Sequence, residues 1–535
     1  MTVISARAAA ELVPDNATLA VSGIAVCGWA EEVGIAIEQA FLETGHPRGL
    51  TLMHAAGIGN YEQMGIHHLG HEGLVTKWIG AHTDAAPGMA HLVEQNKCQA
   101  YCLPQGVVLQ LYREIAAHRP GVITKVGLGT FVDPRLEGAK LNSVTTADYV
   151  KLIELDGEEY LFYKAFPIDV AVIRGTTADG LGNLTMDEEA LLLEQLPLAQ
   201  AAKNSRGVVI AQAKYIARAH SLHPKHVRVP GALVDYVVEA APEHHRQTIL
   251  EQFNPAFCGD IKVPLSGVPA VAVDERLIVG RRAAMELIPR AVVNCGVGFP
   301  DIIGSVTAQE DAAELVTLTT EPGAIGGEPA TGLNFGAAYN ADAFVEHPAQ
   351  FDWYDGGGID VAFLGLGQAD RHGNVNVSRF GGRAVGIGGF VNISQGAKTI
   401  VYCGAFTAGG LKVATGDGQL RILTEGKHHK FVDTVEQISF SGPYATRFGQ
   451  RVVYVTERAV FELREGGLTL IEIAPGVELE RDVLAEMDFT PAIAEPLQPT
   501  PVEIFYERWG KLRSLILAKD TTAPVAGRTA SPPAP

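Results

Sequence analysis

The fold is decided by two similar stretches of sequence, DVAVIRGTTADGLGN at residues 169–183 and DVAFLGLGQADRHGN at residues 360–374. Each begins with an apolar run that is typical of a buried strand and ends in a polar turn that closes on Gly-Asn. Strands that are apolar throughout are characteristic of parallel sheets with helices on both faces. The two stretches therefore predict a layered α/β unit that occurs twice in the chain.

Two further pairs of segments support this duplication. RAAAELVP at residues 7–14 is matched by RAAMELIP at residues 282–289, and LTLMHAAG at residues 50–57 is matched by VTLTTEPG at residues 316–323. The pairs occur in the same order in both halves, as an internal repeat requires. The spacing between pairs is longer in the first half, which predicts an insertion there. We therefore predict two structurally similar α/β domains.

The domain boundaries follow from composition. The stretch at residues 253–271, FNPAFCGDIKVPLSGVPAV, is rich in proline and glycine, which is typical of a linker. We predict a first domain at residues 1–260, a linker at residues 261–280 and a second domain at residues 281–517. Residues 518–535 contain too few apolar side chains to form a core, so we expect a disordered tail.

The charge of the chain limits its partners. In 535 residues, 42 Lys and Arg against 61 Asp and Glu give a formal net charge of −19. Such a charge disfavours binding to nucleic acid or to an anionic membrane surface. The N-terminal residues lack the basic and apolar regions of a signal peptide, and no stretch reaches the roughly 18 apolar residues of a membrane span. We expect a cytoplasmic protein.

Several kinds of site are not indicated. The six cysteines are scattered, without a CxxC pair or the Cys and His spacing of a zinc site, so we expect reduced thiols and no metal. The sequence also lacks a GxxxxGK[ST] loop, an HExxH helix and the nucleophile elbow of serine hydrolases.

Glu321 is the first candidate for chemistry. VTLTTE at residues 316–321 has the pattern of a strand, and Pro322 disfavours helical dihedral angles at Glu321. We therefore expect the carboxylate at the carboxyl end of a strand, the edge where open α/β sheets bind ligands. The following PGAIGG has little side-chain bulk, so a large substrate can approach. Spacing alone also allows a solvated loop carboxylate or a helix-capping residue.

Two other segments are candidates for binding negative charge. GIGGF at residues 386–390 can present backbone N–H groups to an oxyanion, although it also has the pattern of a tight turn between strands. LPQGV at residues 103–107 precedes an amphipathic stretch and brings Gln105 to a helix start, where anions are attracted. A turn glutamine without a partner is the alternative for Gln105.

These segments carry a resemblance to a known family. The chain resembles the family I CoA-transferases, above all the single-chain enzymes of the propionate and acetate or acetoacetate type. The similar segments extend over most of residues 1–515; they are VSGIAVCGWAEEV (21–33), LPQGVVLQLYREIAAHRPGVITKVGLGTFVDP (103–134), TTEPGAIGGEPATGLNFGAAYN (319–340), FDWYDGGGIDVAFLGLGQADRHGNVNVSRF (351–380) and GIGGFVNISQGAKTIVYCGAFTAGG (386–410).

The resemblance implies a fold and a set of site residues. The fold is two α/β halves of the CoA-transferase type, related to NagB- and RpiA-like sugar-phosphate isomerases. Glu321 is implied as the catalytic residue, with Gly388, Gly389 and Gln105 as the oxyanion hole. The further residues implied for substrate or CoA binding are Gly23, Gly106, Gly323, Gly326, Gly327, Asn340, Gly386 and Gly404. Pro322 departs from the family pattern, because better-known relatives have a small polar residue there.

The resemblance also implies an activity. Such an enzyme exchanges CoA between a short-chain acyl-CoA and a carboxylic acid by a ping-pong mechanism through a glutamyl-CoA thioester, as in short-chain fatty acid or ketone body metabolism. The acid can be acetate, propionate, butyrate, lactate or a 3-ketoacid. The expected partners are these substrates and further copies of the chain in a dimer or tetramer, with no cofactor beyond CoA as substrate. The alternatives are an acyl-CoA hydrolase on the same scaffold and a non-catalytic sensor of small ligands.

Overall fold

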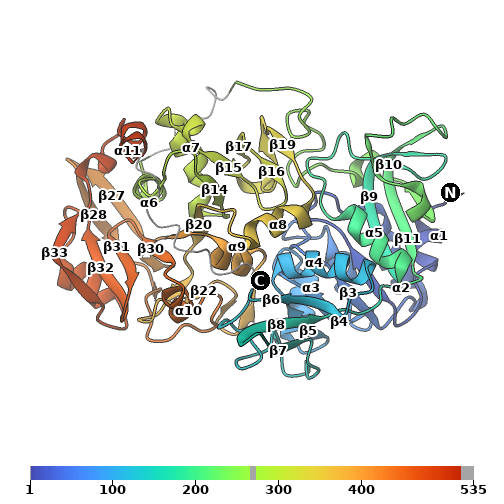
Figure 1. The fold of residues 1–535 in the computed structure, drawn as a ribbon, viewed down its shortest axis with the longest axis horizontal. Coiled ribbons are helices and arrows are strands. Elements are labelled where there is room, and N and C mark those ends of the chain that lie inside the picture. The colour runs from blue at the N-terminus through green and yellow to red at the C-terminus, as the bar shows by residue number, and fades with distance from the viewer. Residues whose placement is uncertain (1, 265–272, 520–535) are drawn as a thin grey trace.

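The computed structural model describes residues 2–264 and 273–519. Two α/β domains lie side by side, the first coloured from blue to green and the second from yellow-green to red (Figure 1). Most of the predicted tail, from residue 520 on, lies outside the described residues. Within the described ranges no helix combines the length and the apolar character needed to cross a membrane.

The first domain is built on a ten-stranded sheet, in which eight strands follow the order β1-β13-β11-β9-β2-β3-β4-β5. These strands are β1 (Thr2–Val3), β2 (Thr18–Val21), β3 (Leu50–Met53), β4 (Val75–Gly80), β5 (Gln99–Cys102), β9 (Val170–Asp179), β11 (Val208–Ala217) and β13 (Tyr236–Glu239). The other two strands are β10 (Leu184–Thr185), which pairs with β9, and β12 (Val227–Val229), which pairs with β10. The α-helices are α1 (Ala6–Glu11), α2 (Glu31–Thr44), α3 (Pro87–Glu94), α4 (Gln105–Ala116) and α5 (Gln195–Asn204).

The second domain has a ten-stranded sheet with the order β19-β16-β15-β14-β20-β25-β30-β31-β32-β33. Its strands are β14 (Val292–Cys295), β15 (Thr317–Thr319), β16 (Ala324–Ile325), β19 (Ala343–Phe344), β20 (Val361–Gly365), β25 (Thr399–Cys403), β30 (Arg451–Val455), β31 (Ala459–Arg464), β32 (Gly467–Ile473) and β33 (Ala492–Pro499). The α-helices are α6 (Glu275–Ala284), α7 (Ile302–Gln309), α8 (His347–Asp355), α9 (Phe390–Gly396), α10 (Gly442–Arg447) and α11 (Leu512–Ala518).

The centres of the two sheets have the same topology. The order is β3-β2-β9-β11-β13 in the first domain and β15-β14-β20-β25-β30 in the second, and each neighbouring pair is parallel. The two stretches that predicted the fold form β9 and β20, at the middle of each series. The prediction of two similar α/β domains is therefore confirmed.

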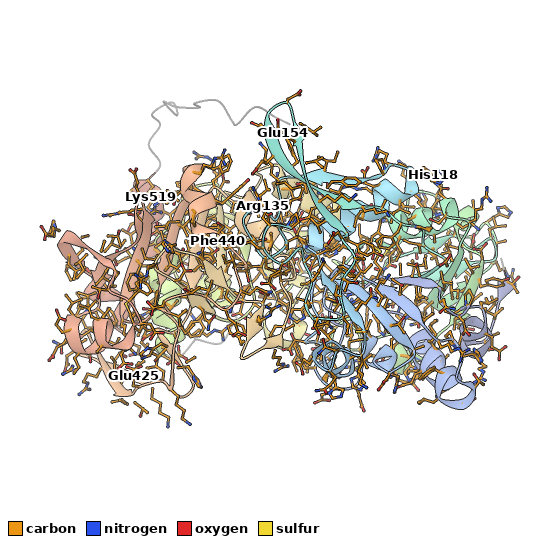
Figure 2. The ribbon with its side chains drawn as sticks, turned by 90° about the horizontal axis from the view of Figure 1, so that it is seen from below. His118, Arg135, Glu154, Glu425, Phe440 and Lys519 are labelled. Atoms are coloured by element: carbon orange, nitrogen blue, oxygen red, sulfur yellow. The ribbon has the colours of Figure 1, made fainter. Side chains whose placement is uncertain are left out.

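The sheets differ at their edges. The insertion predicted in the first half contains β4, β5 and a separate three-stranded sheet of β6 (Gly121–Thr124), β8 (Glu158–Lys164) and β7 (Val150–Leu155). The β7–β8 hairpin, which carries Glu154, projects from the body of the molecule (Figure 2). In the second domain, antiparallel β31 and β32 extend the sheet beyond β30.

The linker is shorter at its C-terminal end than predicted. Helix α6 begins at Glu275, inside the range 261–280 that composition assigned to the linker. Asp274 caps this helix by accepting a hydrogen bond from the Leu277 amide at 2.9 Å, which explains why the helix begins there. Residues 265–272 of the predicted linker lie outside the described residues.

The two domains pack together at the start of α4. The Gly106 amide donates a hydrogen bond to Asn392 Oδ1 of α9 at 3.0 Å. A Cβ atom on Gly106 would lie 2.5 Å from Asn392 Nδ2 and 2.6 Å from Phe351 Cδ1 of α8, so only glycine allows this approach. One cluster of buried apolar side chains includes Val108 of the first domain and Phe351 and Val391 of the second. The core is therefore continuous across the boundary.

Candidate active site

Glu321 lies in a tight turn directly beyond the carboxyl end of β15. The Gly323 amide donates to the Thr320 carbonyl at 3.1 Å, and the Thr320 amide donates to the Ala324 carbonyl at 2.9 Å, so the two bonds close the turn around Glu321 and Pro322. The predicted position at a strand end is confirmed. Pro322 fits this turn, since no hydrogen bond within it requires an N–H at that residue.

The Glu321 carboxylate lies between groups from both domains. Gln105 Nε2, at the start of α4, donates to Glu321 Oε1 at 2.9 Å. On the other side, a Cβ atom on Gly389 would lie 2.9 Å from Glu321 Oε2, so glycine leaves room for this oxygen. Burial raises the pKa of the Glu321 carboxyl, and the hydrogen bond from Gln105 offsets part of that rise. The carboxylate is thus poorly hydrated, which favours reaction as a nucleophile.

Gln105 is fixed at both ends. Its backbone N–H donates to the Gly388 carbonyl at 3.2 Å, and its side-chain Nε2 also lies 2.9 Å from His347 Nε2. The residue is 1% exposed, so water does not compete for these bonds. The expectation that Gln105 begins a helix is confirmed, and the alternative of a glutamine without a partner is wrong.

The backbone amides from Gly386 to Phe390 differ in whether they already have an acceptor. The amides of Ile387 and Gly388 both donate to the Ala81 carbonyl, at 2.7 and 2.9 Å, so the Gly388 N–H is not available to an oxyanion in this structure. A Cβ atom on Gly386 would lie 2.5 Å from the same carbonyl oxygen, which explains the glycine there. Within the described residues the Gly389 amide has no acceptor, so it is the better candidate donor.

A cavity of about 270 Å³ opens between the domains at Glu321. The first domain contributes Ile24, Tyr61 and His82 to its wall, and the second contributes Phe335, Leu364 and Val385. Gln105, Glu321, Gly386, Gly388 and Gly389 also line it. Among the described residues that line the cavity there is no lysine or arginine. Apart from Glu321 itself, the wall is therefore largely apolar and uncharged.

Comparison with known proteins decides the family. A model of the family described as "Coenzyme A transferase" matches residues 3–240. The chain is 51% identical to a caffeate CoA-transferase of Acetobacterium woodii over 96% of this chain and 99% of the relative. It is 43% identical to the acetate CoA-transferase YdiF of Escherichia coli O157:H7 over 94% of this chain and 95% of the relative. The chain belongs to the coenzyme A transferase family.

A solved structure extends the comparison to three dimensions. The acyl-CoA transferase YdiF of Escherichia coli O157:H7, described as a thioester complex with CoA, superposes with a TM-score of 0.89 at 42% identity. The match covers 95% of this CoA-transferase and 97% of that chain. The chain is therefore a CoA-transferase, and the resemblance inferred from its sequence is confirmed.

Seven of the residues predicted for substrate or CoA binding lie outside the wall of the cavity. Gly323, Gly326 and Gly327 have positive φ angles of 116°, 74° and 70° and shape the turns around β16. Asn340 exchanges two 2.8 Å hydrogen bonds with the backbone of Val263, so it fastens the chain entering the linker. For these four residues the structure gives a local structural role.

The other three residues of this set lie near the site without lining it. Gly106 is the contact glycine between α4 and the second domain. The Gly23 amide donates to Glu194 Oε1 at 3.3 Å, directly before Ile24 of the cavity wall. Gly404 follows β25, and a Cβ atom on it would lie 2.8 Å from Lys430 Nζ.

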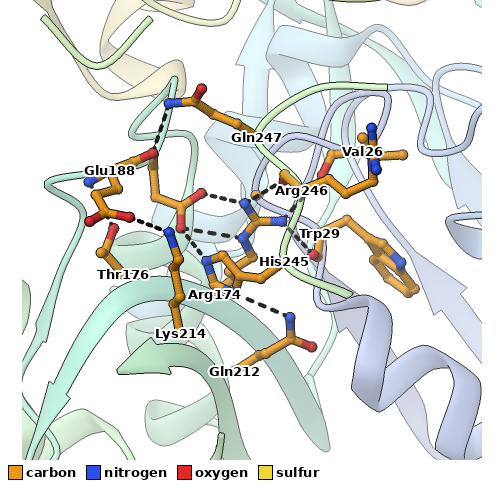
Figure 3. A network of polar contacts seen from close by, with 12 residues as sticks. Val26, Trp29, Arg174, Thr176, Glu188, Gln212, Lys214, His245, Arg246 and Gln247 are labelled. Carbon is orange, nitrogen blue, oxygen red and sulfur yellow. Dashed lines mark hydrogen bonds and ion pairs between the residues drawn. The ribbon is translucent and has the colours of Figure 1, made fainter. Parts of the chain in front are cut away.

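A buried ionic network supports the wall of the cavity in the first domain. Arg174 of β9 forms an ion pair with Glu189 at 2.7 Å and donates to the carbonyls of Val26 and Trp29, next to the wall residue Ile24 (Figure 3). Burial alone would raise the pKa of Glu189, but Arg174 and His245 outweigh it and hold this pKa at about 2. The loop after β2 is thereby held by a permanent charge pair.

Sequence reasoning missed the polar residues behind Gln105. His347, the first residue of α8, and Glu194, which precedes α5, are both completely buried and bonded to each other at 3.0 Å. Neither belongs to a recognisable motif, and 153 residues separate them. His82 was also missed; its Nδ1 atom is buried without a hydrogen-bond partner in the described structure, and the residue lines the cavity.

Proposed function

We propose that this CoA-transferase carries CoA between two carboxylic acids as a thioester on Glu321. The observation that carries the proposal is the poorly hydrated Glu321 carboxylate, bonded to Gln105 and facing Gly389 in a cavity between the domains. A carboxylate is suited to this exchange because it is an acceptor of acyl groups that is already ionised at neutral pH. The YdiF structure described as a thioester with CoA supports the same chemistry here.

The proposed reaction has two covalent intermediates. A Glu321 carboxylate oxygen attacks the acyl-CoA carbonyl, and the C–S bond breaks to give a mixed anhydride and CoA thiolate. The thiolate attacks the glutamyl carbonyl, the donor acid leaves as a carboxylate, and Glu321 holds CoA as a thioester. An acceptor carboxylate then reverses both steps. Protons and electrons balance without a further reactant, so we propose no cofactor beyond CoA as substrate.

The amides around Glu321 have a defined role in this scheme. The glutamyl oxygen carries negative charge when thiolate or carboxylate attacks the glutamyl carbon. Gln105 Nε2 already donates to Glu321 Oε1, so the same bond can stabilise this charge. We propose the Gly389 N–H as the second donor, because Gly389 lies next to Glu321 Oε2 and its N–H has no acceptor in the described structure.

We further propose monocarboxylic acids as the substrates. The relatives are named as transferases for caffeate and acetate. The family resemblance also implied propionate, butyrate, lactate and 3-ketoacids as substrates of this chain. A second carboxylate, as in succinate, would be buried without a cation, since no lysine or arginine of the described residues lines the cavity. Comparing butyrate, succinate and monomethyl succinate as acceptors tests this. We expect kcat/KM for succinate to be about 100-fold below the other two; equal values would contradict the proposal.

Trapping the intermediate tests the role of Glu321. The protein is incubated with acyl-CoA without acceptor acid, reduced with borohydride and mapped by mass spectrometry; we expect the Glu321 carboxyl to be reduced to an alcohol. Glu328→Gln is the matched control, because Glu328 is also buried and its pKa is also raised by burial. Glu328→Gln should still be trapped, whereas Glu321→Gln should lose trapping and about 1,000-fold or more of its turnover. Full turnover by Glu321→Gln would refute the proposal.

The same incubation distinguishes the hydrolase. A hydrolase would release free CoA continuously without an acceptor acid, whereas the transferase should keep CoA on Glu321 and release only one equivalent of donor acid per site. The sensor alternative does not agree with membership among CoA-transferases. A cytoplasmic location and a homo-oligomeric state stay predictions.

A further inference from the structure

We infer that His347 and Glu194 are positioning residues that hold the Gln105 amide against Glu321. The four side chains form one continuous series: Glu194 Oε2 lies 3.0 Å from His347 Nδ1, His347 Nε2 lies 2.9 Å from Gln105 Nε2, and Gln105 Nε2 lies 2.9 Å from Glu321 Oε1. The inference rests on the proposed role of Glu321 as the nucleophile.

The direction of each hydrogen bond follows from the chemistry of the groups. An amide nitrogen only donates, and a carboxylate only accepts, so the two N–H bonds of Gln105 Nε2 point at Glu321 Oε1 and His347 Nε2. His347 must then be unprotonated at Nε2. Its proton lies on Nδ1 and is donated to Glu194, whose other oxygen accepts the Gly23 N–H at 3.3 Å. The histidine is therefore neutral, with a single tautomer.

Burial makes this arrangement rigid. His347 and Glu194 are 0% exposed and Gln105 is 1% exposed, so water cannot substitute for a lost partner. A backbone bond next to this pair adds a second link, because the His347 amide donates to the carbonyl of Leu193, the residue before Glu194, at 3.1 Å. Glu194 and Gln105 belong to the first domain and His347 to the second. The series thus links both domains directly to the reacting carboxylate.

The positioning matters because the Gln105 amide could otherwise rotate. A rotated amide would bring its carbonyl oxygen toward the Glu321 carboxylate, where it repels the charge instead of stabilising it. His347 Nε2 can accept a hydrogen bond only when the NH₂ group of the Gln105 amide faces it, and in that orientation the same NH₂ group also faces Glu321. His347 acts through Gln105 and touches no reacting atom. Its loss should therefore lower turnover and leave substrate affinity almost unchanged.

Two substitutions of His347 test the acceptor. His347→Phe keeps a ring and removes the acceptor, whereas His347→Gln can offer its carbonyl oxygen near the position of Nε2. We expect His347→Phe to lower kcat about 10- to 100-fold, less than the loss of an oxyanion donor itself, with KM within about threefold. We expect His347→Gln to recover most of this loss. Glu194→Gln keeps the shape of the side chain but no longer fixes the tautomer of His347, so it should lower kcat about tenfold.

A double-mutant cycle separates positioning from a structural role. If His347 acts through Gln105, His347→Phe should cost nothing further in a Gln105→Ala background. If the losses multiply, or if His347→Phe alone has full kcat, the inference is wrong. Should His347→Phe not fold, the Glu194→Gln variant in the same two backgrounds gives the answer. Full activity of Glu321→Gln would instead refute the proposed nucleophile, so the two failures are distinguishable.

Discussion

Two ionisable side chains near the carboxyl edge of the second sheet lie where their charges are poorly solvated. Burial raises the pKa of Glu321 and lowers that of Lys430 to about 8. In both cases the surroundings favour the neutral form, so each charge lowers the free energy of unfolding at neutral pH. Such groups are typical of functional sites, where stability is given up for reactivity.

Lys430 gives a prediction about stability. Its ammonium group has no hydrogen-bond acceptor in the described structure, and only the charge of Glu457 offsets the effect of burial. Lys430→Met should therefore raise the free energy of unfolding by roughly 1–3 kcal/mol at pH 7, measured by urea denaturation. The folded pKa lies below the ordinary value of 10.5, so the wild-type penalty is complete below pH 8 and disappears as pH rises towards 10.5. The increase in the free energy of unfolding caused by Lys430→Met should therefore become smaller between pH 8 and pH 10.5.

The control for this prediction is the neighbouring Lys427→Met. Lys427 is exposed, so its substitution should leave the free energy of unfolding within about 0.5 kcal/mol at every pH. An equal effect of the two substitutions would show that burial of Lys430 does not determine the result.

At the scale of single residues, sequence predicted what depends on local pattern. Glu321 was found because a strand, a proline and a bare glycine loop follow one another in the chain. The direction of the Gly388 N–H could not be predicted, because it depends on a contact with the Ala81 carbonyl that no local pattern encodes. His347 and Glu194 acquire meaning only when the two domains meet, so sequence could not find them.

At the scale of elements, three helices determine where Gln105 lies. Helix α4 packs on α8 and α9, with Gly106 against Asn392 and Phe351. The family resemblance implied a role in substrate or CoA binding for Gly106. The structure shows a different reason for the glycine: the helices are too close for a side chain at this position.

A pair of glycine substitutions tests the helix contact. Gly106→Ala should destabilise the protein by about 1–3 kcal/mol and lower turnover, because a Cβ atom there would overlap Asn392 and Phe351 and displace Gln105. Gly304→Ala in α7 is the control, since its Cβ atom would have no neighbour closer than 3.7 Å. Alanine favours helices over glycine by about 1 kcal/mol, so Gly304→Ala should be neutral or stabilising. Thermal melting and steady-state kinetics measure both; a neutral Gly106→Ala would contradict this packing.

The same three helices contain a pH-sensitive carboxyl group. Burial raises the pKa of Asp355, at the end of α8, to about 7, although Asn392 of α9 and Gln110 of α4 donate hydrogen bonds to it. The folded pKa exceeds the ordinary value of 3.8, so stability is highest below about pH 4 and is lost as pH rises through 7. In Asp355→Asn this loss should be absent.

The measurement compares unfolding free energies from pH 4 to pH 8. The difference between Asp355→Asn and wild type should move in favour of the variant by roughly 1–3 kcal/mol over this range. Asp156→Asn, in the exposed β7–β8 turn, is the control and should follow the wild-type curve. Parallel curves for Asp355→Asn and wild type would contradict the prediction.

At the scale of the whole molecule, the duplication was predictable from the sequence, but the interface between the two domains was not. Apolar runs and turn residues recur in the same order, so sequence revealed two similar domains. Strand order depends on contacts between distant segments, and the two copies use the same order with different edges. The candidate active site lies where the copies meet: Gln105 and Glu194 come from one copy and Glu321 and His347 from the other. Neither domain alone contains the series of groups at the site.

The continuous core predicts that the two domains unfold together. Because one buried cluster contains side chains of both domains, exposing one domain's surface also removes packing from the other. The unfolding of each domain can be followed by tryptophan fluorescence in two variants. One variant keeps only Trp78 of the first domain and the other keeps only Trp509 of the second, with the other three of the four tryptophans replaced by Phe. Their urea midpoints should agree within about 0.3 M and coincide with circular dichroism. Two separated transitions would show that the shared core does not couple the unfolding of the two domains. The candidate active site between the domains could then be lost while one domain stays folded.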